Sequence, residues 1–333
     1  MSWRQVRAWR DTLRHQLDAL PRTMLHPKTL RAGVEISLDA LSDAALDNLD
    51  GRRVRPYESA TLVLARTVPT ASIEWAAVLL GWGTRVTMKP PSTTPHLAHW
   101  LVEAAEQVGL PLSVNSDRGA LAQSSVVIAM GRDDTVRQIE APLPTTTSYL
   151  GLGDRFSAAW VEHPDQWKLL AEDIALHDSR GCMSPSVVFT PLPLKDACQT
   201  LQTALDGVAV RWPKGELQPF EGAAIRSRRQ LASATTGVAL RSDFGEVHGL
   251  VWPQSRASLP RCVAVFHAAS TEEMARHVRP FEAQLSTLGV PSHRQPFFRD
   301  AFDSARVCET GEMQRPPLHR MHDGLDWIAH THR

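Results

Sequence analysis

Short apolar runs alternate with longer amphipathic runs over residues 61–129, and this alternation limits the possible folds more than any other feature of the chain. The pattern predicts strands at 61–65, 83–88, 110–114 and 125–129, and helices at 72–80 and 95–108. Strands that alternate with helices of about 10–15 residues form βαβ units around a parallel sheet. We therefore expect an α/β fold whose ligands bind at the carboxyl ends of the strands.

The remaining segments continue this pattern less regularly. Residues 1–50 are polar, rich in arginine and helical in pattern, which fits outer helices of a domain or an oligomer contact equally well. Breakers between 211 and 258 predict an irregular segment. In the second half we expect strands at 186–189, 262–266 and 305–308, and helices at 193–205 and 271–288.

Composition excludes several classes of partner. Lysine plus arginine equals aspartate plus glutamate at 36 each, so no net charge favours nucleic acid or an anionic membrane surface. The longest apolar run, 75–80, is far too short to span a bilayer. Four cysteines without a CxxC pair, and no apolar leader, predict free thiols in the reducing cytoplasm.

Cys182 lies on a turn between an amphipathic helix, 167–175, and a short apolar strand, 187–189. Gly181 and Pro185 interrupt both patterns around it. A thiol at such a corner is held by rigid elements on both sides, and the glycine lets a substrate approach the backbone. The alternative is a buried structural cysteine, because free cysteine is among the most buried residue types.

Five segments, taken in order, resemble those of one family. They are 63–69, 79–92, 127–131, 180–185 and 306–317 with 322–324. Together they resemble the acyl-CoA reductases of bacterial luminescence (LuxC type), a branch of the aldehyde dehydrogenase superfamily, over about residues 60–326. The resemblance implies an aldehyde dehydrogenase-like α/β fold. A Rossmann-type nucleotide domain would occupy 1–170, including the helical region 1–50, and a second α/β catalytic domain 171–333, including a C-terminal tail.

The activity that the resemblance implies is NADPH-dependent reduction of an acyl thioester, either acyl-CoA or acyl-carrier protein, to the aldehyde. Cys182 would be the nucleophile and carry the acyl group as a covalent thioester, since a thiolate is both a good nucleophile and a good leaving group. Lys89 would reach the adenosine ribose or a 2′-phosphate, with Ser92 nearby. Gly131 would let the backbone approach the dinucleotide.

Two departures from the family pattern bear on the activity. Thr67 stands where the family has an asparagine that helps to bind the developing oxyanion, and Arg66 replaces a glycine. A threonine hydroxyl offers one shorter donor, so the backbone N–H of Cys182 would carry more of the stabilisation. The glutamate segment that supplies a general base in aldehyde-oxidising relatives is missing, which favours reduction over oxidation or hydrolytic acyl transfer.

The rival hypothesis is a non-catalytic or degenerate homologue that binds nucleotide or a partner enzyme, because of Thr67 and the short chain. We expect no metal site, since no carboxylate or thiol spacing completes the histidines at 319, 322, 330 and 332. We expect no nucleic-acid partner and no membrane span, and a homo-oligomer is possible.

Several other side chains have two interpretations each. His177 and Arg180 could lower the pKa of the Cys182 thiol, but solvated loop positions are favoured. The basic run 226–229 could contact a phosphate of coenzyme A or an acidic carrier protein, although a solvated run is the simpler interpretation. Core packing is favoured over an acyl tunnel for Trp160, Trp167 and Trp252.

Overall fold

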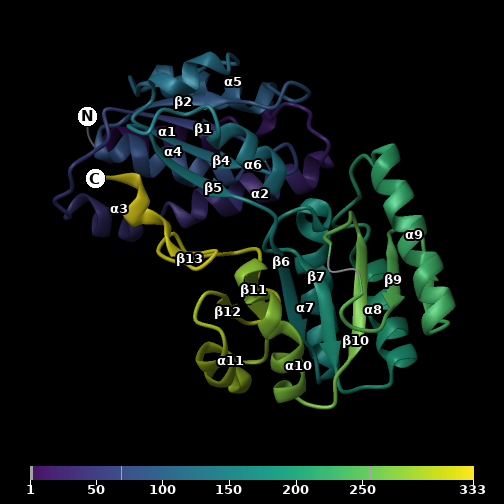
Figure 1. The fold of residues 1–333 in the computed structure, drawn as a ribbon. Coiled ribbons are helices and arrows are strands. Elements are labelled where there is room, and N and C mark those ends of the chain that lie inside the picture. The colour runs from purple at the N-terminus through teal and green to yellow at the C-terminus, as the bar shows by residue number, and fades with distance from the viewer. Residues whose placement is uncertain (1–2, 69, 255–256) are drawn as a thin grey trace.

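The computed structural model describes residues 3–68, 70–254 and 257–333. It has two lobes, each built around one largely parallel sheet (Figure 1). The strands of the first sheet are β1 (Ser59–Val63), β2 (Arg85–Lys89), β3 (Leu112–Val114), β4 (Val126–Met130) and β5 (Ser148–Leu152). Their order is β3-β2-β1-β4-β5 and all neighbours are parallel. The predicted α/β fold is confirmed.

The second lobe contains a sheet of seven strands. They are β6 (Phe156–Trp160), β7 (Pro185–Thr190), β8 (Ala239–Arg241), β9 (Glu246–Gly249), β10 (Cys262–His267), β11 (Leu285–Gly289) and β12 (Arg306–Cys308). The order is β12-β11-β6-β7-β10-β9-β8, and only β8 runs antiparallel to its neighbour. A separate two-stranded hairpin joins β13 (Met321–His322) to β14 (Leu325–Asp326).

The α-helices surround both sheets. They are α1 (Trp3–His15), α2 (Pro27–Ala40), α3 (Asp43–Asp50), α4 (Ala71–Trp82), α5 (His96–Gln107), α6 (Asp133–Glu140), α7 (Pro164–Ala175), α8 (Leu194–Val208), α9 (Pro219–Thr235), α10 (Thr271–Val278) and α11 (Gln295–Ala301). The helical character predicted for residues 1–50 is confirmed by α1, α2 and α3. None of the described helices is long and apolar enough to cross a bilayer.

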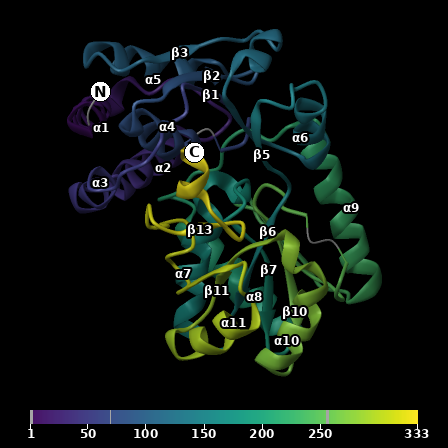
Figure 2. The same cartoon turned by 60° about the vertical axis from the view of Figure 1, so that its left-hand side comes forward.

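Both faces of the seven-stranded sheet are buried because its central strands are apolar at successive positions, which point to opposite faces. Val188 faces the core that α7 and α8 cover. Val187 and Phe189 face the opposite core, to which α10 and α11 contribute. Turning the molecule shows α9 along the outer edge of this lobe (Figure 2).

The C-terminal segment returns to the first lobe and ends near α3 (Figure 1). Trp327 and Ile328 belong to the apolar core of that lobe, and the ring of Trp327 lies 4.5 Å from that of Trp75 in α4. The indole N–H of Trp82 donates to Thr331 Oγ1 at 2.8 Å. The hairpin that precedes this segment is therefore held between the two lobes.

Two predictions of local structure were wrong. Residues 211–258 are not irregular throughout, because α9 begins there with a capping box in which Gln218 and Glu221 satisfy each other's backbone N–H groups. The predicted helix 271–288 ends at Val278, and the chain forms β11 from Leu285. Pro280 explains the early end, because a proline ring cannot continue the helical hydrogen-bond ladder.

The chain passes from the first sheet to the second between Leu152 and Phe156. Strand β6 and most of α7 therefore belong to the second lobe, ahead of the domain boundary that we expected at residue 170.

Candidate active site at the meeting of the two sheets

The carboxyl edge of the first sheet faces the amino edge of the second. Val68 follows β1, and Gly181 shortly precedes β7. A Cβ atom built on Gly181 would lie 3.3 Å from Val68 Cγ2, so the glycine allows close packing between the lobes. In the first sheet, the strand order reverses between β1 and β4, which is where open parallel sheets bind ligands.

The turn that leads to Cys182 is strained. His177, Asp178 and Ser179 have φ values of 60°, 55° and 58°, a left-handed conformation that side chains with a Cβ rarely adopt. Such residues cost about 1–3 kcal/mol each and persist only where the surroundings hold them. Asp178 forms a buried ion pair with Arg261 and accepts the Gly215 N–H at 2.9 Å.

His177 and Arg180 are not solvated, contrary to our expectation. His177 is buried against Gly33 of α2, and burial lowers its pKa to about 4. Arg180 is paired with Glu221 of α9 and bonded to the Glu216 carbonyl. The charge of Arg180 is therefore neutralised by a carboxylate of α9. The buried contacts of His177 and Arg180 hold the turn before Cys182 in place.

Cys182 is half-buried and is held by two neighbouring strands, β6 and β11. Ser157 Oγ of β6 donates to the Cys182 carbonyl at 2.6 Å and accepts the Thr287 N–H of β11 at 3.0 Å. The thiol also has hydrogen bonds with the side chain of Ser286 and the backbone of Met183. Burial and the charge of Asp323 raise the pKa of Cys182 to about 12, so the group is a thiol at neutral pH.

Two residues next to Cys182 were missed by the sequence reasoning. A ring nitrogen of His322, a carboxylate oxygen of Asp323 and the Cys182 sulfur all lie within 4.8 Å of one another. Only 10% of the His322 side chain is exposed, so this histidine belongs to the interior of the site. The resemblance of segment 322–324 to the family could have indicated that His322 belongs to the site. The spacing of the histidines raised only the question of a metal site.

A small cavity adjoins this cluster, and a larger cavity adjoins the small one. The smaller, about 10 Å³, is lined by Met183, Ser286, Arg306 and His322 among others, and holds about one water molecule. The larger, about 460 Å³, is more open and shares Arg306, Arg320 and Met321 with the smaller one. The open cavity therefore adjoins the chamber beside Cys182.

Three of the predicted residues lie along the carboxyl edge of the first sheet. Lys89 ends β2, Ser92 is exposed on the turn that follows, and Gly131 directly follows β4. Burial, and the nearby charge of Arg118, lower the pKa of the Lys89 ammonium. Lys89 and Arg118 suit an anionic group at this edge, although the Asp117 carboxylate also lies near Lys89 and opposes the shift. A Cβ built on Gly131 would meet only Thr135, at 3.8 Å, so the backbone there is open to close approach.

The start of α6 does not offer a free helix terminus to a phosphate. The Asp133 N–H donates to Asp154 Oδ2 at 3.3 Å, and the Asp154 N–H donates to Asp133 Oδ1 at 2.8 Å. These two carboxylates occupy the position that would stabilise an anion by the helix dipole. A phosphate at this edge would therefore rely on Lys89 and Arg118.

Thr67 lies one residue before Val68, which contacts Gly181. The end of β1 is thus close to the turn that carries Cys182. The neighbouring Arg66 extends over the ring of Phe220 in α9, 5.5 Å from its centre. This contact directs the guanidinium of Arg66 towards α9.

The loop between β12 and the hairpin is held next to the site by hydrogen bonds. Asp173 of α7 accepts the Gly311 N–H at 2.6 Å, and the Gln314 side chain donates to Ser184 Oγ at 2.7 Å. Burial raises the pKa of Asp173 to about 7. Hydrogen bonds from backbone N–H groups, of which that of Gly311 has the largest effect, stabilise the carboxylate and partly offset this rise. These hydrogen bonds connect the loop to α7 and to the start of β7, which follows Cys182.

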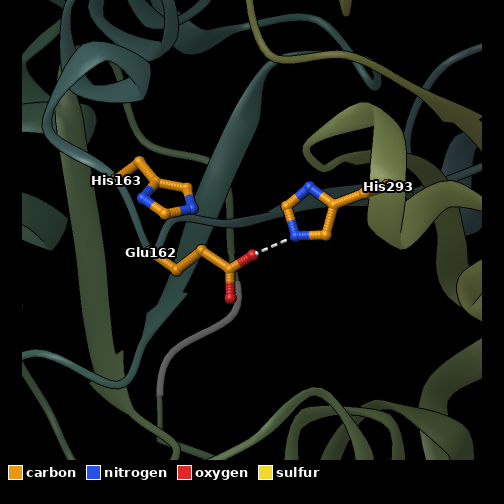
Figure 3. A group of neighbouring side chains, drawn as sticks. All are labelled: Glu162, His163 and His293. Carbon is orange, nitrogen blue, oxygen red and sulfur yellow. Dashed lines mark ion pairs between the residues drawn. The ribbon is translucent and has the colours of Figure 1, made fainter.

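A second cluster, Glu162, His163 and His293, lies at the end of β6 and is drawn in Figure 3. His293 Nε2 is 2.8 Å from Glu162 Oε1, and Arg294 binds both carboxylate oxygens at 3.0 and 2.9 Å. Burial opposes ionisation of Glu162, but Arg294 and His293 lower its pKa to about 2. A guanidinium already neutralises this carboxylate, so the cluster is an ion-pair network unsuited to a divalent cation.

The basic run 226–229 lies on α9 and is not uniformly solvated. Arg228 is 3% exposed and donates to the Cys262 carbonyl at 3.0 Å, while Arg229 pairs with Glu246. Core packing is confirmed for Trp160 and Trp167, which are 1% and 2% exposed. Trp252 packs partly buried against the core that contains Phe189.

Solved aldehyde dehydrogenases have the same fold. An NAD-dependent benzaldehyde dehydrogenase from Corynebacterium glutamicum matches with a TM-score of 0.74 and 14% identity, over 94% of this chain and 82% of that one. An NADP-dependent glyceraldehyde-3-phosphate dehydrogenase from Bacillus halodurans, complexed with NADP, matches with a TM-score of 0.70 and 14% identity, over 97% and 81%. At such identities the likeness shows the fold alone, and it confirms the predicted aldehyde dehydrogenase-like architecture.

No curated protein matches the chain by sequence. A family model does match: that of acyl-CoA reductase (LuxC), over residues 115–330. The match contains Gly131, Cys182, His322 and Asp323, whereas Thr67, Lys89 and Ser92 precede it. It covers well over half of the chain, and its Cys182 lies where the two sheets of an aldehyde dehydrogenase-like fold meet. The protein therefore belongs to the acyl-CoA reductase (LuxC) family.

Proposed function

We propose that the protein reduces an acyl thioester, carried by coenzyme A or an acyl-carrier protein, to the aldehyde with NADPH. One observation carries this proposal. Cys182 is anchored by Ser157 at the amino edge of the second sheet, directly opposite the ligand-binding edge of the first. A nucleophile in this position can hold an acyl group against a cofactor bound on the first sheet.

Different residues of the chain carry out the acyl transfer and stabilise the oxyanion. Cys182 Sγ attacks the thioester carbonyl, the bond to the carrier sulfur breaks, and the acyl group stays on Cys182 as a thioester. The Cys182 N–H and Thr67 Oγ1 donate to the oxygen that becomes negative. The acyl carbon on Cys182 would receive a hydride, which a reduced nicotinamide would supply when bound on the first sheet. Collapse of the resulting hemithioacetal releases the aldehyde and returns the Cys182 thiolate.

The nucleotide side of the proposal rests on Lys89, Ser92 and Gly131. Lys89 and Arg118 repel each other, and a 2′-phosphate between them would relieve that repulsion. This favours NADPH over NADH. The open backbone at Gly131 suits the dinucleotide passing over the edge of β4.

The test is aldehyde production. Purified protein is incubated with an acyl-CoA series and NADPH, while NADPH oxidation and trapped aldehyde are both measured. We expect aldehyde and oxidised cofactor in equal amounts, and neither with Cys182→Ser, since an alkoxide forms far less readily at neutral pH. The proposal fails if the wild type produces no aldehyde from any thioester, or if Cys182→Ser keeps the wild-type rate.

One observation favours the non-catalytic alternative. The Cys182 thiol is protonated and the chamber beside it holds about one water molecule. A homologue that binds nucleotide without reacting would bind NADPH in a titration yet give no acyl adduct and no aldehyde. The same experiment separates the two functions.

A further inference from the structure

His322 is held beside Cys182 by the turn of the β13–β14 hairpin. Asp323 and Gly324 form this turn, with φ values of 52° and 80°. Asp-Gly is a favoured pair for a two-residue hairpin turn in which both residues adopt positive φ. The turn lies between the lobes, and the His322 ring contacts the edge of Trp75 of α4, with centres 6.1 Å apart.

The three polar groups form a chain of contacts. His322 Nε2 lies 3.8 Å from Asp323 Oδ2, and a ring nitrogen of His322 lies within 4.8 Å of Cys182 Sγ. Asp323 is 3% exposed, and its other oxygen, Oδ1, has no hydrogen-bond partner within the described residues. Contacts between a nucleophile and its base are often this long without substrate and shorten when substrate binds.

The charges around the cluster come from four elements. Arg155, between β5 and β6, has its Nε 3.6 Å from Asp323 Oδ2. Arg320, before β13, is held by Glu74 of α4 at 2.6 Å, and Arg306 of β12 lines the same small chamber. Burial lowers the pKa of His322 to about 4; Asp323 opposes this, while Arg320 and Arg155 add to it.

These surroundings leave His322 neutral and Cys182 protonated at neutral pH. A protonated thiol is a poor nucleophile, so acylation needs a group that accepts its proton. Arg155, Arg306 and Arg320 lie around the cluster, and their positive charges disfavour a divalent cation beside the thiol. His322 is a neutral base whose ring nitrogen lies within 4.8 Å of the Cys182 sulfur.

We infer that His322 accepts the proton of the Cys182 thiol as its sulfur attacks the thioester, and that Asp323 positions the imidazole. This inference rests on the proposed function. The S–H bond of Cys182 breaks and an N–H bond forms on His322, while the new bond from sulfur to the acyl carbon forms. The imidazolium then returns the proton to the departing carrier thiolate. His322 is thus a catalytic residue and Asp323 a positioning residue.

The experiment measures the rate at which Cys182 is acylated, by rapid mixing with acyl-CoA and intact-protein mass spectrometry, for the wild type, His322→Asn and His330→Asn. His330 is exposed in the same C-terminal segment and serves as the matched control. We expect His322→Asn to slow acylation by about 10²-fold, the lower end of the usual range for a general base, because burial keeps the pKa of His322 below neutral pH. His330→Asn should match the wild type.

The pH profile of the wild type gives an independent test if His322→Asn does not fold. With a neutral base present, acylation should change little between about pH 6 and 8.5. Attack by the small fraction of free thiolate would instead rise about tenfold per pH unit, because the thiol pKa lies far above this range. A tenfold rise per unit in the wild type overturns the inference.

Asp323→Asn distinguishes two effects of Asp323: its orientation of the His322 imidazole, and the effect of its negative charge on the Cys182 thiol. Removing the carboxylate lowers the pKa of Cys182, so its alkylation by iodoacetamide should become faster. Acylation by acyl-CoA should nevertheless become slower, because the imidazole loses its orientation. Faster acylation would overturn the positioning role.

The outcomes distinguish the two proposals. No adduct on the wild type contradicts the proposed function itself. An adduct that forms equally fast on His322→Asn, with the same pH profile, leaves the proposed function standing and overturns the role of His322.

Discussion

Ser157 Oγ donates to the carbonyl oxygen of Cys182 at 2.6 Å while it accepts the backbone N–H of Thr287. One buried hydroxyl therefore ties the nucleophile's peptide to both β6 and β11. The position of Cys182 depends on this sheet as much as on its own turn.

Ser157→Ala should destabilise the fold and misplace the thiol. The substitution leaves a buried carbonyl and a buried N–H without their partner, which costs about 1–3 kcal/mol for each such group. We expect a lower urea midpoint and slower acylation of Cys182. Ser227→Ala, on the exposed side of α9, is the control and should change stability by less than about 0.5 kcal/mol. Unchanged stability and acylation in Ser157→Ala would show that the bond is dispensable.

Lys89→Ala should raise the Michaelis constant for NADPH much more than that for NADH, because the ammonium would pair with the 2′-phosphate. Arg85→Ala, at the opposite end of β2, is the matched control and should affect neither cofactor. Steady-state kinetics with both cofactors provide the measurement. Equal effects of Lys89→Ala on the two cofactors would remove the 2′-phosphate contact.

Thr67→Val should lower turnover with little change in substrate binding, since a bond to the developing oxyanion strengthens in the transition state. The loss should be at most about 10²–10³-fold, the effect of removing a full oxyanion donor. Thr67→Ser keeps the hydroxyl and should retain most activity, and Thr67→Asn should restore a longer donor. If Thr67→Val turns over as fast as Thr67→Ser, the hydroxyl has no such role.

Asp173 should make the protein less stable as the pH rises. An unfolded aspartate titrates near about 3.9, whereas the folded group has its pKa raised to about 7. Between these values the folded state binds the proton and the unfolded state does not, so the stabilisation is complete below about pH 4 and is lost through pH 7. Asp173→Asn should therefore gain stability relative to the wild type between pH 5 and 8. Urea midpoints at both pH values measure this, and a constant difference between the two proteins would contradict it.

Local sequence patterns predicted the elements around Cys182 because the information is local. A helix with one apolar face, a glycine, a proline and a β-branched run place the thiol at a corner without reference to the rest of the chain. The same reasoning missed α9, whose capping box from Gln218 to Glu221 was a signal that we weighed less than the breakers around it.

The contact between His322 and Cys182 could not be predicted from the spacing of residues in the sequence. The two residues are far apart along the chain and meet only in the folded structure. Its approach depends on the C-terminal segment packing Trp327 onto Trp75, and on the Asp323-Gly324 turn lying between two lobes. Burial of His177 and Arg180 was likewise invisible, since it comes from Gly33 and Glu221 in distant helices. Charged and histidine residues near a nucleophile are solvated or buried according to tertiary packing that a single sequence does not encode locally.

The most direct test of the account is the intact mass of the protein after anaerobic incubation with acyl-CoA in the absence of NADPH. We predict a mass increase of one acyl group, located on Cys182 by peptide mapping, removed by hydroxylamine and absent from Cys182→Ser. Addition of NADPH should discharge the adduct and release the aldehyde. An unmodified wild-type mass, or an acyl group on another residue that NADPH does not discharge, would contradict a covalent thioester on Cys182.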